Sequence, residues 1–259
     1  MKICVLASGS SGNCVYAGTA STHVLIDAGM SGRETLNRLG QLGVKLSDIA
    51  AICLTHEHSD HIAGLSVLHS RHGIALYANA GTRDAVRVNE SMRSLVWHIF
   101  TTGSAFQIGD LTLEPFSVSH DACEPVGFVV ASGPIRVGVV TDIGVSTRLV
   151  QERLKHCQAL IIESNHDERL LADARRPWPL KQRIAGRLGH LSNQHAAELI
   201  AGIAGAGLKQ VFLSHLSEDC NRPELALKTA QAALNRHGHV HVQVKLTYAD
   251  RISDVWSSD

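Results

Sequence analysis

The chain has 259 residues, of which 44% are hydrophobic and 19% charged, a composition that supports a globular core and excludes a disordered protein. Its formal net charge is zero, which excludes a broad basic surface for non-specific nucleic-acid binding but not a local basic patch. The apolar run at residues 3–7 is too short for a signal peptide, no later run has transmembrane length, and the six cysteines include no CxxC pair. We therefore expect a cytoplasmic protein with no membrane partner.

Taken in chain order, the first half alternates short β segments with turns. We predict strands at residues 2–7, 14–17, 23–27, 50–54, 74–78, 111–118, 127–130 and 135–140, with helices over 31–42, after 61 and from about 82. The second half interleaves helices at 146–154, 180–188, 194–203 and 223–237 with strands at 159–163, 210–214, 241–246 and 252–256. No linker divides the chain, so we expect one α/β domain over residues 1–259. This order predicts a four-layer αββα sandwich, in which two mixed β-sheets pack face to face with the helices outside.

Potential metal ligands follow the predicted strand at 50–54, where residues 56–61 read HEHSDH. Alternate side chains of an extended loop point the same way, so His56 and His58 can bind one ion. Asp60 and His61 are adjacent, so they diverge and can serve a second ion. Imidazole nitrogen and carboxylate oxygen suit Zn²⁺, and also Mn²⁺ or Fe²⁺. Such a dense cluster at the end of a buried strand predicts a metal site.

Three later predicted strands also end near a potential ligand, namely His120, Asp142 and His215. With these residues the sequence resembles the metallo-β-lactamase superfamily over essentially its whole length. The resemblance implies a first metal held by His56, His58 and His120, a second held by Asp60, His61 and His215, and Asp142 as the bridge between them. It also implies that Asp27, at the end of the third strand, supports the histidine loop.

Two positions narrow the chemistry that the resemblance implies. An oxygen-reducing diiron member would carry glutamate where this chain has His58, and true lactamases usually lack an aspartate at the position of Asp142. The set of ligands therefore fits hydrolysis.

Two further segments bear on the substrate. Ser192 or Asn193 can cap a helix that begins near Gln194, and such a helix start suits phosphate, although an ordinary capped helix explains the pattern equally well. Glu163 and His190 match a glutamate and a histidine that assist phosphate hydrolysis in transfer-RNA 3′-processing endonucleases of the fold. The chain departs from those enzymes because it has Leu-Ser-Asn after His190 and lacks a long glycine- and proline-rich arm.

The YycJ/WalJ-like subgroup of the superfamily is a closer match. Its hallmarks resemble SGSSGN at residues 8–13, ESNHD at 163–167, PWPLK at 177–181 and GHLSN at 189–193. That subgroup is associated with exonuclease-like action on DNA.

A local basic segment agrees with a phosphate substrate. Residues 169–187 contain six basic residues and one acidic residue, and they lie between Glu163 and His190. We expect Arg175 and Arg176 to contact substrate. The alternative is a solvated helix face. Trp178 can stack on a base or serve as a packing plug.

Together these features predict a dinuclear metal-dependent phosphodiester hydrolase, exonuclease-like on DNA rather than RNA, with two divalent ions, Zn or Mn. In this hypothesis a metal-bridging hydroxide attacks phosphorus, Asp60 orients it, and His190, held by Glu163, donates to the phosphate or leaving oxygen. Ser10, Asn13, Ser192 and Asn193 complete the predicted substrate contacts. The alternatives are a hydrolase of a small cyclic phosphodiester, thioester or lactone, and a metal-bearing signalling or scaffolding protein with little turnover.

Overall fold

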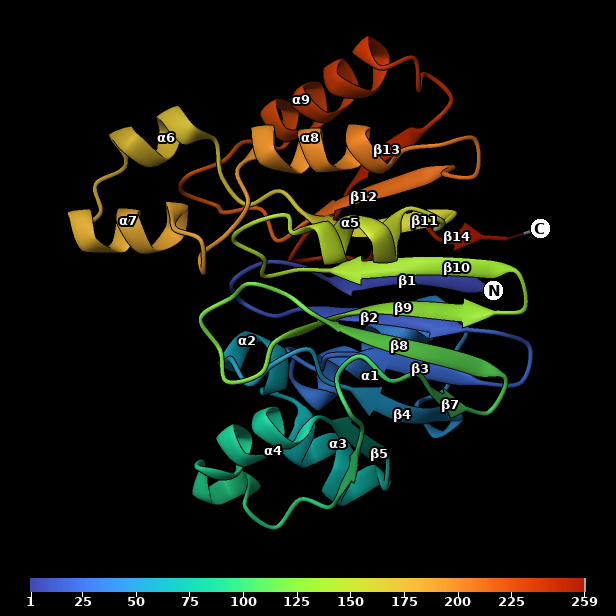
Figure 1. The fold of residues 1–259 in the computed structure, drawn as a ribbon. Helices are drawn as coiled ribbons and strands as arrows, with labels where there is room; N and C mark the ends of the chain where they lie inside the picture. Colours follow the sequence, from blue (N-terminus) through green and yellow to red (C-terminus); the bar gives the residue numbers. More distant parts are fainter. Residues whose placement is uncertain (259) are drawn as a thin grey trace.

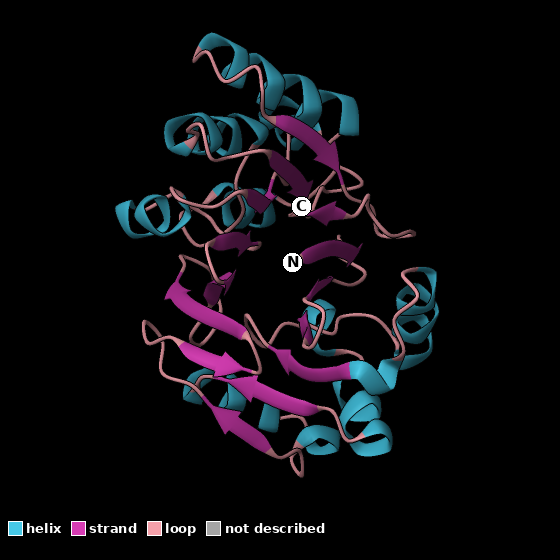
Figure 2. Ribbon diagram, turned by 90° about the vertical axis from the view of Figure 1, so that its right-hand side faces the viewer, coloured by secondary structure: helices cyan, strands magenta, loops and turns pink. Residues whose placement is uncertain are grey.

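A computed structural model describes residues 1–258 as two seven-stranded sheets with helices on their outer faces (Figures 1 and 2). The strands are β1 (Lys2–Ala7), β2 (Cys14–Gly18), β3 (His23–Ile26), β4 (Ile49–Cys53), β5 (Ala75–Ala78), β6 (Trp97–Ile99), β7 (Phe106–Ile108), β8 (Leu111–Ser117), β9 (Val126–Ser132), β10 (Ile135–Val140), β11 (Ala159–Glu163), β12 (Gln210–Ser214), β13 (Gln243–Leu246) and β14 (Trp256–Ser257). The helices are α1 (Gly32–Gln41), α2 (Ser59–Ile62), α3 (Leu65–His72), α4 (Ala80–Arg87), α5 (Arg148–Leu154), α6 (Glu168–Asp173), α7 (Trp178–Ala185), α8 (Asn193–Ile203) and α9 (Pro223–Arg236), with 3₁₀ turns at Leu46–Asp48 and Glu90–Met92.

Both sheets are mixed. The first has the order β14-β1-β2-β3-β4-β5-β6, and the second has the order β13-β12-β11-β10-β9-β8-β7. In each sheet an antiparallel meander leads into parallel strands, β3 to β6 in the first and β10 to β13 in the second. The carboxyl ends of the parallel strands in a sheet meet at one edge, which is where ligand sites form in such sheets.

The strands are apolar on both faces because each sheet lies between two apolar layers. In β1, Ile3 and Val5 enter the core between the sheets, whereas Cys4 and Leu6 enter the core beneath helices α1, α3 and α4. A third core lies between the second sheet and helices α5, α8 and α9. The core between the sheets also takes Val139 and Ile161 from the second half of the chain. We therefore infer that the two halves fold as one domain.

These layers confirm the predicted αββα sandwich, and most predicted elements lie within a few residues of the observed ones. The sequence missed β6, β7, α2 and α6, because three-residue strands and helices of four and six residues are too short to show a periodicity, and α2 begins within the loop that was expected to be extended.

The strand predicted at 252–256 is wrong over most of its length. The Ser253 hydroxyl accepts the Val5 N–H in place of a backbone carbonyl, and only Trp256–Ser257 pairs with β1. Among residues 1–258, no helix is both long and apolar enough to cross a membrane.

Candidate metal centre

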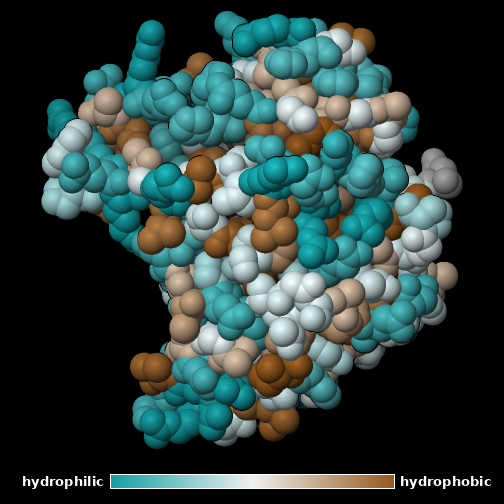
Figure 3. All heavy atoms as spheres, in the orientation of Figure 1, coloured by the Kyte–Doolittle hydropathy of each residue, from teal (hydrophilic) through white to brown (hydrophobic). Residues whose placement is uncertain are grey.

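The potential ligands converge at one edge of the sandwich, where several strands end. His56 and His58 follow β4, His120 follows β8, Asp142 follows β10 and His215 follows β12. In Figure 1, β10 points toward the side from which α6 and α7 project, and Figure 3 shows this side hollowed between those helices and the α4 region.

Three residues at strand ends in this region have left-handed backbone conformations that side chains other than glycine seldom adopt. They are Asp27, Asp142 and His215, with φ values of 63°, 55° and 56°. The side chains of Asp142 and His215 meet, with Asp142 Oδ1 3.3 Å from His215 Nδ1, whereas Asp27 contacts His61. Strained backbone of this kind persists only where the surrounding structure holds it in place, and it is common at functional sites.

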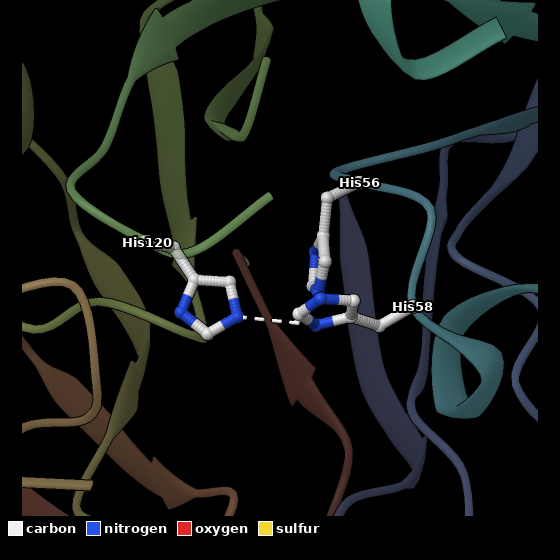
Figure 4. Close-up of side chains that lie close together, drawn as sticks. All are labelled: His56, His58 and His120. Carbon is white, nitrogen blue, oxygen red and sulfur yellow. Dashed lines mark hydrogen bonds between the residues drawn. The ribbon is translucent and has the colours of Figure 1, made fainter. Parts of the chain in front are cut away.

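The first cluster consists of His56, His58 and His120, whose nitrogens lie within 4.8 Å of one another (Figure 4). His120 approaches from the second sheet and the other two from the first, so the cluster spans the two sheets. The His120 Nδ1 donates to the Gly189 carbonyl at 3.2 Å, which turns Nε2 toward His58 Nδ1, 3.2 Å away. Two ring nitrogens at this distance repel each other through their lone pairs unless a proton or a cation lies between them.

The second cluster consists of Asp60, His61 and His215. Asp27 accepts a hydrogen bond from His61 Nδ1 at 2.8 Å and two more from Thr55, as expected for a residue that supports the histidine loop. His61 Nε2 therefore faces Asp60 Oδ2 at 3.5 Å and Asp142 Oδ2 at 3.1 Å. A carboxylate behind a ligating histidine is the usual way to fix its tautomer and orientation.

Asp142 lies between the two clusters. Its Oδ1 is 3.8 Å from His120 Nε2 of the first cluster and 3.3 Å from His215 Nδ1, and its Oδ2 is 3.1 Å from His61 Nε2. One carboxylate thus reaches ring nitrogens of both clusters, which is the position that the resemblance implied for a bridging ligand.

Glu163, at the end of β11, is fully buried and holds two histidines with a single oxygen. Its Oε1 accepts from His190 Nδ1 at 2.7 Å and from His215 Nδ1 at 2.8 Å, while Oε2 accepts the backbone N–H groups of Ile143 and Leu191. The sequence did not predict the bond to His215. Glu163 therefore orients a potential ligand of the second cluster in the same way that Asp27 orients His61.

The charges of these buried groups depend on one another. Burial disfavours the cation of His215, but the carboxylates of Asp142 and Asp60 raise its pKa to about 10. Burial likewise disfavours the carboxylate of Glu163, but bonded His190 lowers the pKa of Glu163 to about 2. Burial also opposes the charge of Asp142, yet His215 and His61 hold the pKa of Asp142 well below its usual range. The buried carboxylates thus require positive charge on their histidine side, from protons or from metal.

The donor set fits divalent cations. Among residues 1–258, buried His56 Nε2, His215 Nε2 and Asp142 Oδ2 have no hydrogen-bond partner although all three face the clusters, and an unpaired buried polar atom is costly. Burial, reinforced by neighbouring His61, lowers the pKa of His56 well below its usual range, and the neutral ring that results is the form that binds a metal. Nitrogen and carboxylate donors of this kind suit zinc or manganese.

The structure changes the assignment of three residues predicted to contact substrate. Ser192 caps α8 and donates to Glu168, and the amide of buried Asn193 is bonded to Ser164 and Asn221. The N–H of Asn193 is taken by the His166 carbonyl. These bonds engage both side chains and the Asn193 N–H, so the ordinary capped helix is the better description.

Asn13 is also buried, and it is bonded within the protein to Gly9 and Asp60. Ser10 is exposed in the turn after β1, so its contact with substrate stays a prediction.

Helices α6 and α7 form a projecting arm, which we define as residues 168–187 (Figure 1). A small apolar cluster that includes Leu171, Ile184 and Cys220 packs the arm against the body. Arg183 pairs with Asp121, which directly follows His120, so the arm is tied to the first cluster. Arg176 pairs with the exposed carboxylate of Asp219, so a phosphate would have to compete with this surface ion pair, and the contact of Arg176 with substrate stays a prediction.

Four cations of the arm have no ion pair within residues 1–258, namely Arg169, Arg175, Lys181 and Arg187. Trp178 is 67% exposed, which rules out the packing plug and leaves its indole ring open to a partner.

The chain is similar in sequence to known proteins. Residues 22–216 match the β-lactamase superfamily domain. The chain is 37% identical to exodeoxyribonuclease YycJ of Bacillus anthracis, over 90% of this chain and 89% of that protein. It is 38% identical to exodeoxyribonuclease WalJ of Streptococcus pneumoniae, over 88% of this chain and 86% of that protein.

Solved structures support the fold. The metallo-β-lactamase fold protein YhfI of Bacillus subtilis superposes with a TM-score of 0.74 at 16% identity, covering 99% of each chain. The short form of human tRNase Z superposes with a TM-score of 0.67 at 19% identity, also covering 99% of each chain.

Proposed function

This chain belongs to the metallo-β-lactamase superfamily, and we propose that it is an exodeoxyribonuclease that uses two divalent metal ions, zinc or manganese. Relatives named exodeoxyribonucleases match nearly the whole chain at 37–38% identity. His56, His58 and His120 would hold one ion, Asp60, His61 and His215 the other, and Asp142 would contact both. When bound, such a pair of ions acidifies a water molecule and neutralises charge on the attacked phosphate.

The observation that carries the proposal is the Glu163–His190 pair beside the two clusters. His190 Nδ1 is 2.7 Å from Glu163 and 3.7 Å from Asp142, and its side chain is 18% exposed. Burial disfavours the imidazolium form, but Glu163 raises the pKa of His190 above its usual value. With Nδ1 donating to Glu163, the protonated ring keeps Nε2–H as a second donor. That group can donate to a phosphate oxygen or protonate the leaving oxygen, as hydrolysis of a phosphodiester requires.

The test is degradation of end-labelled DNA strands by the purified protein supplied with Zn²⁺ or Mn²⁺. We expect nucleotides to be released progressively from one end of DNA, more slowly from an RNA strand of the same sequence, and not at all after treatment with a chelator. A panel that includes a cyclic dinucleotide, a thioester and a lactone serves as the comparison. Rapid turnover of one of these compounds with intact DNA would reject the proposal in favour of a small-molecule hydrolase.

The arm supplies a second expected result. Replacing Arg175 and Arg187 together with alanine should weaken binding of single-stranded DNA and flatten its salt dependence, by about 0.7 in slope for each phosphate that is no longer neutralised. Trp178→Ala should weaken binding while leaving that slope unchanged, because base stacking releases no counterions. Arg236→Ala, at the exposed end of α9, is the control and should change neither quantity. Equilibrium binding over a range of salt concentrations measures both, and an unchanged slope in the double variant would make the arm a solvated surface.

A further inference from the structure

The turn between β1 and β2 lies against the second cluster through one buried side chain, that of Asn13. Its Nδ2 donates to Asp60 Oδ2 at 3.0 Å and to the Gly9 carbonyl at 3.1 Å, and its Oδ1 accepts the Gly9 N–H at 3.0 Å. Its backbone N–H donates to the Asp60 carbonyl at 2.8 Å, and its carbonyl accepts from the Gly29 N–H at 2.9 Å. Asn13 is only 4% exposed, so a substrate cannot reach its amide without breaking these bonds.

We propose that Asn13 is a positioning residue of the second metal site, which acts by holding the Asp60 carboxylate. The inference rests on the two-metal site proposed above and assigns a residue outside the seven ligands to it. The oxygen that Asn13 holds is Asp60 Oδ2, which lies 3.5 Å from His61 Nε2 and 3.6 Å from His215 Nε2. Asn13 therefore bonds to the oxygen atom that faces the other members of the second cluster.

A count of hydrogens shows why this amide does not compete with a metal. The Asn13 Nδ2 carries two hydrogens, and Gly9 and Asp60 accept them. His61 Nε2 is 3.1 Å from the same nitrogen, but no hydrogen of the amide is left for it. In the neutral ring, whose Nδ1 donates to Asp27, this Nε2 has a lone pair open to a cation. Asn13 thus restrains the carboxylate and leaves the imidazole free to ligate.

The backbone of Asp60 packs closely against Gly29 and Asn13, which fixes the position of the Asn13 side chain. A Cβ added at Gly29 would lie 1.6 Å from the Asp60 carbonyl oxygen and 2.5 Å from the Asn13 nitrogen. Gly9, which exchanges two hydrogen bonds with the Asn13 amide, has a φ of 145°, in a region that favours glycine. The close packing at Gly29 and the two bonds to Gly9 therefore fix the direction from which Asn13 contacts Asp60.

Mutation of a hydrogen-bond partner that orients a metal ligand usually lowers metal affinity or activity by about 10- to 100-fold. We expect Asn13→Ala to lower the affinity of one of the two ions by about 10- to 100-fold and to leave the other unchanged. Chelator competition followed by elemental analysis gives both affinities. The matched control is Ser11→Ala, an exposed residue of the same turn, which should behave like the wild type. Circular dichroism and the thermal midpoint of the zinc-loaded variants show whether each is folded.

A double-mutant cycle tests the route through Asp60. Asp60→Ala alone should lower the affinity for the second ion. Adding Asn13→Ala should not lower this affinity further, because the Asn13 amide then has no Asp60 carboxylate to hold. Additive decreases would overturn the inference even if the single variant folds poorly. Normal affinity for both ions in Asn13→Ala, combined with weaker DNA binding, would overturn it in favour of a substrate contact. Fewer than two ions in the wild type, or intact DNA with the wild type, would instead reject the proposed function.

Discussion

Asp142→Ala is expected to release both metal ions together and to reduce nuclease activity to that of the chelator-treated wild type. Asp142 is the carboxylate that reaches both clusters, with His120 Nε2 at 3.8 Å on one side and His61 Nε2 at 3.1 Å on the other. Two cations held side by side repel each other, and the negative charge between them offsets that repulsion. Without it, each cluster must bind its ion beside an unscreened like charge.

Elemental analysis after dialysis against a metal-free buffer is the measurement. Asp60→Ala is the contrasting variant, because Asp60 belongs to the second cluster alone and its removal should release one ion. If Asp142→Ala kept one ion at full affinity, the two sites would be independent and the bridging role would be wrong.

His190→Ala should lower kcat by about 10²- to 10⁴-fold, the usual range for removal of a general acid, while both ions are retained. His190 has a half-buried ring with Nδ1 bonded to Glu163, whose Oε1 it shares with His215, and it belongs to neither of the two clusters defined above. Its matched control is His195→Ala, an exposed histidine in the first turn of α8, which should leave kcat unchanged. Release of metal in His190→Ala would place His190 among the ligands, and full activity would remove it from the chemistry.

Glu163→Gln separates the two histidines that this residue holds. In the mechanism expected from the sequence, Glu163 only holds His190, so its replacement would change kcat alone. Because Glu163 Oε1 also accepts from His215 Nδ1, the structure adds an expected decrease of affinity for the second ion. At saturating metal, the double variant Glu163→Gln with His190→Ala should be little slower than His190→Ala, since residues that act as a unit are not additive. Titration of kcat with metal distinguishes the two effects.

The sequence by itself was sufficient for the architecture and for most of the potential ligands. Long apolar strands and amphipathic helices show periodicities within a short stretch of sequence. The potential ligands closely follow strands, and the geometry of the sheets brings the strand ends together. The HEHSDH run at 56–61 is local in the same sense. The elements that escaped prediction, β6, β7, α2 and α6, are those too short to show a period.

Only the tertiary structure decided which partner each polar side chain takes. Asn13 turned from a substrate contact into a support for Asp60, 47 positions away, and Glu163 acquired His215, 52 positions away. In the same way Arg176 forms an ion pair with Asp219, 43 positions away. A hydrogen bond or an ion pair needs contact at about 3 Å. Spacing along the chain carries no information on such contacts between distant loops, because the packing of the two sheets sets them.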